Sequence, residues 1–208
     1  MDLAELTDRI VDRLAGYVRG DHAAQARAME PDLAYGRHFH HPPADARPAA
    51  VMALLFERDG RVVMPLVVRG EAMTRHAGQI ALPGGSVEPG ETNHAAALRE
   101  LEEELAVPQD AVRLLGHLPP LWVFVSNFTV TPWLAIAEAP PDLVPQPGEV
   151  AEVLEVPWSD LIRGDCRGQF RRAYGSLEFI APCFRWQGRK IWGATAVILS
   201  EVMAAIGT

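Results

Sequence analysis

The sequence is poor in cysteine and contains no apolar run long enough to cross a membrane. Only Cys166 and Cys183 occur among 208 residues, which is too few for a zinc cluster, and a chain of this length does not need a disulfide staple. We expect two unpaired thiols in a reducing compartment. The first residues lack the basic and apolar segments of a signal peptide, and a membrane-spanning helix needs about 20 apolar residues. A cytoplasmic protein is therefore the expectation.

An excess of positive charge is also missing. The formal net charge of −8 argues against a duplex nucleic acid or an anionic membrane as partner, because either would favour a basic surface. We therefore expect neither a nucleic acid nor a membrane as partner. A phosphorylated small molecule stays compatible, because bound cations can screen its phosphates. The hydrophobic content of 49% and the charged content of 22% are those of an ordinary globular protein. We expect one domain over residues 47–208, with residues 1–46 as an N-terminal helix and extended connection packed on it, and a homodimer remains open.

Two hydrophobic periodicities divide the chain into helices and strands. Helical spacing predicts helices at residues 2–18, 93–105 and 194–206, with Thr92 as the N-cap of the second. Asp59-Gly60 predicts the tight turn of a hairpin. The expected strands are residues 48–56, 61–68, a short stretch ending at 85, 111–118, 127–138, 150–157 and both arms of a hairpin over 184–192. Because strands and helices do not alternate strictly, we expect a mixed α/β or α+β sandwich.

Three histidines lie in the connection over residues 19–47, which shows no clear period. His38, His40 and His41 make a metal site conceivable. No carboxylate or cysteine follows them at ligand spacing. We therefore expect a solvated surface loop in which these histidines are incidental.

Glutamates crowd the end of the helix expected at residues 93–105. On that helix Glu100, Glu103 and Glu104 fall within an arc of about 100°, whereas Glu102 lies outside it. Like charges at this spacing cost roughly 0.2–0.5 kcal/mol per pair, and acids in the last turn oppose the helix dipole. A divalent cation such as Mg²⁺ or Mn²⁺ would offset this cost, because both prefer carboxylate oxygens. A plain acidic, solvated face explains the charges alone equally well.

Two neighbouring features favour a functional site over a solvated face. Arg99 is the single base of the acidic segment, and an ion pair with Glu91 would tie the preceding loop to the helix. Pro83-Gly84-Gly85 supplies a tight turn whose backbone can come close to a ligand. Together they indicate that the acidic face is oriented toward a bound group.

These residues resemble the Nudix box, G-x5-E-x7-R-E-U-x-E-E-x-G-U, where U is a bulky aliphatic residue. The matching positions are Gly85, Glu91, Arg99, Glu100, Leu101, Glu103, Glu104 and Val107. Ala106 departs from the pattern, which has glycine there; alanine costs little at that position unless its φ is positive. The resemblance implies the Nudix fold, a mixed sheet sandwiched between helices, and an enzyme that hydrolyses a nucleoside diphosphate linked to another moiety.

The resemblance also implies a division of labour among the residues of the box. Glu100, Glu103 and Glu104 would bind Mg²⁺ or Mn²⁺, assisted by a turn carbonyl of Gly84 or Gly85. Gly85, Glu91 and Arg99 would support the structure of the box. A carboxylate that is not used as a ligand would accept the proton of the attacking water: either one of the helix glutamates or Glu149 in the loop after residue 138. The sequence does not choose between these bases.

A second, narrower resemblance concerns residues 66–85, which are similar to the signature LLTxTxxxR-x3–4-G-x3-FPGG of coenzyme A diphosphatases. The end from Gly78 to Gly85 fits, with Leu82 in place of Phe. The front end departs, because the threonines are absent and Arg75 is shifted by one or two positions. This resemblance implies coenzyme A as substrate, with 3′,5′-ADP and 4′-phosphopantetheine as products. Arg69 and Arg75 flank the loop before the box and are candidates, with Gly78, for substrate binding; ordinary surface arginines explain the two arginines equally well.

Two alternatives stay open at this point. One is a Nudix hydrolase of ADP-ribose or of a dinucleotide, because the front of the signature is incomplete. The other is a Nudix-like regulator that binds a nucleotide without cleaving it. The complete acidic set argues against the regulator, since a pure binder need not keep every catalytic carboxylate.

Overall fold

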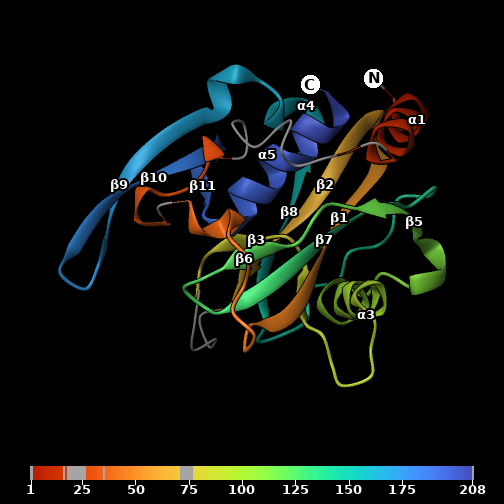
Figure 1. The fold of residues 1–208 in the computed structure, drawn as a ribbon. Coiled ribbons are helices and arrows are strands. Elements are labelled where there is room, and N and C mark those ends of the chain that lie inside the picture. Colours follow the sequence, from red (N-terminus) through yellow and green to blue (C-terminus); the bar gives the residue numbers. More distant parts are fainter. Residues whose placement is uncertain (1, 16, 18–26, 35, 71–76, 208) are drawn as a thin grey trace.

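The centre of the fold is an eight-stranded mixed sheet (Figure 1). In this computed structural model, residues 2–15, 17, 27–34, 36–70 and 77–207 are described. The strands of the sheet are β1 (Arg47–Arg58), β2 (Arg61–Arg69), β3 (Ile80–Ala81), β4 (Gly84–Ser86), β5 (Arg113–His117), β6 (Leu121–Val123), β7 (Phe128–Ile136) and β8 (Val150–Pro157). The main path runs β3-β2-β1-β7-β5, while β4 pairs with β1, β6 with β7 and β8 with β2.

Strand β1 is buried on both faces from residue 49 to residue 56, so its sequence is hydrophobic over that stretch. Met52, Leu54 and Phe56 belong to the core on one side of the sheet, and Ala53 and Leu55 belong to the core on the other side. This alternation follows from the two-residue period of a strand. β1 pairs in parallel with β7 and antiparallel with β2. Its position in the middle of the sheet explains why the sequence pattern is a continuous apolar run.

The predicted hairpin between β1 and β2 is confirmed. Asp59 and Gly60 have φ angles of 52° and 71°. Both lie in the left-handed region, as a two-residue turn matched to the twist of the strands requires. The turn fixes the register in which Arg58 pairs with Arg61.

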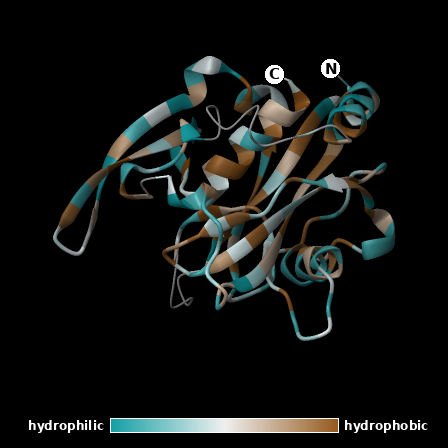
Figure 2. Ribbon diagram, in the orientation of Figure 1, coloured by the Kyte–Doolittle hydropathy of each residue, from teal (hydrophilic) through white to brown (hydrophobic). Residues whose placement is uncertain are grey.

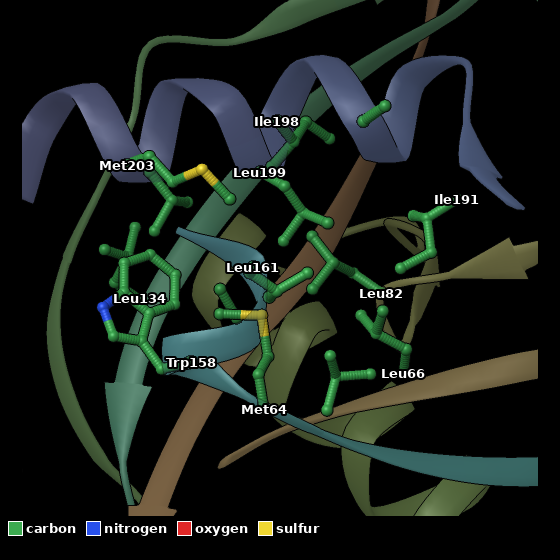
Figure 3. Packing of buried hydrophobic residues seen from close by; sticks show 14 of the residues in the cluster. Met64, Leu66, Leu82, Leu134, Trp158, Leu161, Ile191, Ile198, Leu199 and Met203 are labelled. Atoms are coloured by element: carbon green, nitrogen blue, oxygen red, sulfur yellow. The ribbon is translucent and has the colours of Figure 1, made fainter. Parts of the chain in front are cut away.

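Helices cover both faces of the sheet. α3 (Asn93–Leu105) packs on one face, and α5 (Ala194–Ile206) lies on the other beside α1 (Leu3–Leu14) and α4 (Trp158–Leu161) (Figure 1). Figure 2 shows hydrophobic colours concentrated along the strands and α5. In Figure 3, Leu199 and Met203 of α5 lie over Met64 and Leu134 of the sheet. The expected mixed α+β architecture, a sheet between helices, is thus confirmed.

A second, three-stranded sheet was only half expected from the sequence. It consists of β9 (Arg167–Tyr174), β10 (Leu177–Trp186) and β11 (Arg189–Trp192), in the order β11-β10-β9. The predicted hairpin over 184–192 is confirmed, with Gln187 and Gly188 at positive φ. β9 escaped prediction because its charged residues and its lack of β-branched side chains give it no strand pattern.

The connection before β1 corrects the expectation of a wholly solvated loop. It holds two short 3₁₀ helices, η1 (Asp32–Ala34) and η2 (Arg37–Phe39). His40 and His41 are exposed, as expected, but His38 is only 4% exposed. Its Nδ1 lies 2.8 Å from Oε1 of Glu30, a buried partner that precedes it in the sequence. The carboxylate that pairs with His38 therefore precedes the three histidines in the sequence instead of following them.

The remaining helical segments are short. η3 (Gln109–Ala111) follows α3, and η4 (Gly164–Cys166) precedes β9. None of the described helices is both long enough and apolar enough to pass through a membrane. The most apolar of them, α5, is 13 residues long and packs in the core.

Helix α3 ends on a strained residue. Ala106, the position at which the box pattern has glycine, has φ 56° and ψ 28° and donates its N–H to the Glu102 carbonyl. The left-handed conformation costs a residue with a Cβ roughly 1–2 kcal/mol relative to glycine. The positive φ that makes alanine costly at this position is therefore present.

We expect Ala106→Gly to stabilise the protein by about 1 kcal/mol, because Ala106 is exposed and glycine removes the strain without losing packing. Urea denaturation gives the free energy of unfolding. Ala95→Gly, inside the same helix, is the matched control and should lose roughly 0.5–1 kcal/mol. Equal losses in both variants would show that the positive φ carries no strain.

Candidate active site

Helix α3 is held in place at its start and along its apolar side. The Thr92 hydroxyl accepts a hydrogen bond from the Ala95 N–H at 3.4 Å, so Thr92 is the N-cap that the sequence predicts. Leu101 and Leu105 are fully buried against β1, and Leu98 is half-buried. Because the leucines fix the rotation of the helix about its axis, they also fix the direction in which each glutamate of the helix points.

Arg99 is the hub of the acidic segment. Its Nε and Nη2 donate to the two carboxylate oxygens of Glu91 at 3.0 and 3.1 Å. Its Nη1 donates to both Glu100 and Glu103 at 2.9 Å, and Nη2 also reaches the Ser86 carbonyl at 3.0 Å. These hydrogen bonds lower the pKa of Glu91 below its ordinary value and raise the pKa of Arg99. One guanidinium therefore ties the loop before α3, strand β4 and two helix carboxylates together.

The two glycines before α3 are required for different reasons. Gly84 has φ 149°, and a Cβ there would collide with the backbone of Ala50 and Val51 in the neighbouring strand. At Gly85 a Cβ would occupy the place of the Glu100 carboxylate. Strand β4 can therefore approach β1 only with glycine at position 84, and glycine at position 85 lets the Glu100 carboxylate lie against the turn.

Glu104 is the buried acid of the set. It is 4% exposed, and its Oε2 accepts a hydrogen bond from the Gly84 N–H at 3.0 Å. Burial raises the pKa of Glu104 to about 7, an effect that the negative charges of Glu100 and Glu149 reinforce and the positive charge of Arg69 opposes. Burial also raises the pKa of Glu100 despite its bond to Arg99. A carboxylate with so little solvation is stabilised by a nearby cation.

The loop over residues 139–149 brings a fourth carboxylate to this cluster. The N–H groups of Val144 and Gln146 donate to the carbonyls of Leu105 and Glu104 at 3.0 and 2.9 Å. These are carbonyls that the end of α3 leaves without a helical partner. The Glu149 carbonyl in turn accepts from the Gly70 N–H at 2.7 Å. Sequence reasoning nominated Glu149 but missed this docking, because backbone hydrogen bonds of a proline-rich loop leave no side-chain pattern.

Arg69 faces the acidic cluster from the end of β2. Its charge acts on Glu104, and its buried Nε has no hydrogen-bond partner among the described residues. The backbone of Arg69 exchanges hydrogen bonds with Gly78 and Gln79, at 2.9 and 3.0 Å, which close the base of the intervening loop. Arg75, nominated together with Arg69 and Gly78, lies outside the described residues.

Glu102 and Glu103 differ from the two inner glutamates. The Glu103 side chain is 56% exposed and is held by Arg99. Glu102 is exposed and accepts a hydrogen bond from Gln109 at 2.8 Å. The structure therefore places Glu100 and Glu104 together near Glu149 and Arg69, with Glu103 at the rim and Glu102 away from the cluster.

The donor set suits a hard divalent cation by its chemistry. Carboxylate oxygens at the helix meet a glycine turn whose backbone is accessible, and the raised pKa values of Glu100 and Glu104 indicate negative charge that is poorly compensated. Among the described residues, however, no three acidic, histidine or cysteine side chains already converge on one point. Glu100 and Glu103 are turned toward Arg99, so binding of a metal would require their carboxylates to rotate.

Metal-free protein should lose stability as the pH rises from about 4.5 to about 7. Below pH 4.5, the ordinary pKa of a glutamate, Glu104 is protonated in both the folded and the unfolded chain. Between 4.5 and about 7 the unfolded carboxyl ionises while the folded one keeps its proton, so the contribution of the folded-state proton is lost as the pH rises through about 7. Thermal melting in the presence of a chelator measures the effect, and Glu104→Gln should flatten the curve. An identical slope in that variant would assign the pH dependence to other groups.

Comparison with known proteins agrees with this geometry. Residues 46–173 match the NUDIX domain family. The chain is 35% identical over 182 residues to an uncharacterized Nudix hydrolase NudL of Cronobacter sakazakii, covering 77% of this chain and 89% of that protein. It is 37% identical over 167 residues to the NudL of an Enterobacter species, covering 77% and 83%.

A solved structure extends the likeness to the fold. A MutT/nudix family protein from Enterococcus faecalis superposes with a TM-score of 0.53 at 16% identity, over 85% of this chain and 68% of that one. Members of this family generally use divalent metal ions and act on small nucleotide substrates. The matched domain and the relatives together show that the chain belongs to the Nudix hydrolase family and is a pyrophosphohydrolase.

Proposed function

We propose that the protein hydrolyses the pyrophosphate bond of a nucleoside diphosphate derivative with Mg²⁺ or Mn²⁺, and that this substrate is coenzyme A or one of its acyl derivatives. The products would be 3′,5′-ADP and 4′-phosphopantetheine. The observation that carries the proposal is the group of Glu100, Glu104 and Glu149 beside Arg69 at the Gly84-Gly85 turn. It combines negative ligands for a cation with one positive group for a phosphate.

The metal would be held by Glu100, Glu103 and Glu104, with the Gly84 carbonyl as a further ligand. When bound, it would neutralise phosphoryl charge and lower the pKa of a coordinated water. Glu104 is the best-positioned ligand, because its burial and its hydrogen bond to the Gly84 N–H fix its carboxylate. The Nη1 of Arg99 holds the carboxylates of Glu100 and Glu103 close together. On metal binding, both carboxylates would rotate away from Arg99 toward the metal.

Glu149 is the base that the geometry favours. Its loop is docked on the end of α3, its charge acts on both Glu100 and Glu104, and no described hydrogen bond occupies its carboxylate. In the proposed step a water oxygen forms a bond to phosphorus and the bond from that phosphorus to the bridging oxygen breaks. The proton of the water passes to Glu149, and the bridging oxygen leaves with its electron pair on the second phosphate.

The choice of coenzyme A rests on the stretch before the box. Gly78 and Arg69 close the loop between β2 and β3, and Arg69 presents a buried Nε without a protein partner toward the site. A phosphate oxygen of the substrate would supply that partner. The resemblance of residues 78–85 to the coenzyme A diphosphatase signature then selects coenzyme A over ADP-ribose or a dinucleotide.

Three glutamate variants separate the proposed roles. Glu104→Gln and Glu103→Gln should abolish turnover, and Glu104→Gln should also weaken Mn²⁺ binding measured by calorimetry. Glu149→Gln should lower kcat by about 10²–10⁴-fold, the usual contribution of a general base, while Mn²⁺ binding stays close to that of the wild type. Glu102→Gln is the matched control and should leave kcat unchanged. Full activity of Glu149→Gln would return the role of base to the helix glutamates.

A substrate panel tests the identity of the nucleotide. With Mg²⁺ or Mn²⁺ present, kcat/KM should be highest for coenzyme A among coenzyme A, ADP-ribose, NADH and a diadenosine polyphosphate. Arg69→Gln should raise KM more than it lowers kcat, because it removes a group that binds phosphate. A preference for ADP-ribose would refute the substrate assignment and leave the hydrolase itself intact. Absence of turnover on the whole panel would refute the proposed reaction.

A further inference from the structure

The three-stranded sheet β9–β10–β11 differs in charge from the rest of the chain. Its span, residues 167–192, holds six basic residues and one acidic residue, a formal charge of +5, so the remaining residues carry −13 of the total of −8. The basic residues are Arg167, Arg171, Arg172, Arg185, Arg189 and Lys190. In Figure 1 the β9–β10 hairpin extends away from α3 and its acidic residues. A net charge computed for the whole chain conceals this segregation.

Strand register places cations and aromatic rings on one face of this sheet. Phe170 pairs with Ala181 and Arg172 with Phe179, while Cys183 pairs with Trp192 and Arg185 with Lys190. Paired residues, and residues two apart on a strand, share a face. The opposite face carries Phe184 and Ile191, both 0% exposed and part of the core. The cationic and aromatic face therefore points away from the core.

Two rings on the outward face, those of Trp192 and Phe170, are each covered by a cation. The Arg172 guanidinium carbon lies 4.3 Å from the centre of the Trp192 ring, and the Lys190 Nζ lies 4.6 Å from the centre of the Phe170 ring. The two rings meet edge to face at 5.8 Å and 87°. Arg172 and Lys190 are exposed, and neither forms an ion pair with a carboxylate of the described residues. The rings hold these two side chains in place, and no carboxylate of the described residues neutralises their charges.

We propose that this face binds a single-stranded polynucleotide, with phosphates at the cations and bases stacked on the guanidinium and ring surfaces. A compact anion requires donors that converge on one point, whereas these cations are spread over three strands, roughly 10 Å across. Interleaved cations and aromatic rings are the arrangement that proteins use for single strands of any sequence. The exposed plane of the Arg172 guanidinium offers a base a stacking surface.

The acidic remainder of the chain does not contradict this assignment. The acids that contact this sheet, Glu152 at Arg189 and Asp160 at Trp186, do so on the face opposite Arg172 and Lys190. Acids farther away than the Debye length of about 10 Å at 0.1 M salt are screened. The expectation that no nucleic acid binds rested on the net charge of the whole chain, which does not show the formal charge of +5 of this sheet. An anionic membrane fits less well, because Leu177 is the one strongly exposed large aliphatic residue in the described part of this sheet.

Fluorescence anisotropy of a 5′-fluorescein-labelled 12-residue oligouridylate tests the proposal, with oligodeoxythymidylate as a second arm. The oligonucleotide carries no pyrophosphate, so binding is independent of the proposed hydrolysis. Arg172→Gln/Lys190→Gln should weaken binding at least about tenfold and reduce the slope of log Kd against log salt by about 1.4, or about 0.7 for each lost phosphate contact. Hydrolysis of the best small substrate should stay at the wild-type rate.

Two further variants control for charge and for folding. Arg61→Gln/Arg113→Gln removes the same charge from exposed arginines outside the three-stranded sheet, and this variant should bind the oligonucleotide as the wild type does. Arg172→Lys/Lys190→Arg keeps the charge and should restore most of the affinity if folding is the same by circular dichroism. Lys190 is the only lysine in the sequence, so its acetylation by an amine reagent, read by mass spectrometry against the N-terminal amine, should be slowed by the oligonucleotide.

Several outcomes would overturn the proposal. These are no binding by the wild type at low salt, equal loss in the two double-glutamine variants, or acetylation of Lys190 that ignores the oligonucleotide. Tighter binding to vesicles of anionic phospholipid than to the oligonucleotide would assign the face to a membrane. A wild-type dimer by light scattering that becomes monomeric in Arg172→Gln/Lys190→Gln would assign it to a second copy of this chain.

Discussion

The close approach of helix α3 to the glycine turn of β4 is the constraint on which the site depends. Gly84 leaves no side chain against the backbone of β1, and Gly85 leaves none against Glu100 of the helix. This lets the Gly84 N–H reach the carboxylate of Glu104 and gives the Glu100 carboxylate its space. A carboxylate can be buried there only because a backbone donor meets it. The turn thus converts an acidic stretch of sequence into a cluster with defined positions.

The Arg99 network supplies the second part of the arrangement. Like charges on one helix face repel, and a single guanidinium that pairs with Glu100 and Glu103 of the helix, and with Glu91 before it, reduces this repulsion. The same contacts hold the carboxylates of Glu100 and Glu103 toward Arg99. Arg99 therefore serves as an internal counterion. In the proposed reaction the helix carboxylates would exchange it for the metal cation that binds the phosphate.

Sequence reasoning worked where side chains carry the signal. The leucines of α3, the Asp59-Gly60 turn and the even apolar run of β1 predicted the helix, the hairpin and the central strand, because burial and turn chemistry leave a period or a dipeptide. Strand β9 was missed because arginines at an exposed sheet edge have no period of their own. Glu149 was a candidate base from the sequence, but its position near Glu104 was not predicted, because the backbone hydrogen bonds that dock its loop leave no trace in a sequence. The burial of Glu104 also escaped the helical projection, which shows angle but not the depth of the neighbouring turn.

The docking of the proline-rich loop on α3 has a consequence for local stability. The amides of Val144 and Gln146 satisfy carbonyls in the last turn of the helix, so lifting the loop would leave those carbonyls bare and fray the turn that carries Glu104. Opening of the loop and melting of the helix end are then one cooperative event with one free energy. The loop over residues 139–149, which has no regular structure, thereby stabilises the end of α3. Glu104 on the helix and Glu149 at the end of the loop then become ordered or disordered together.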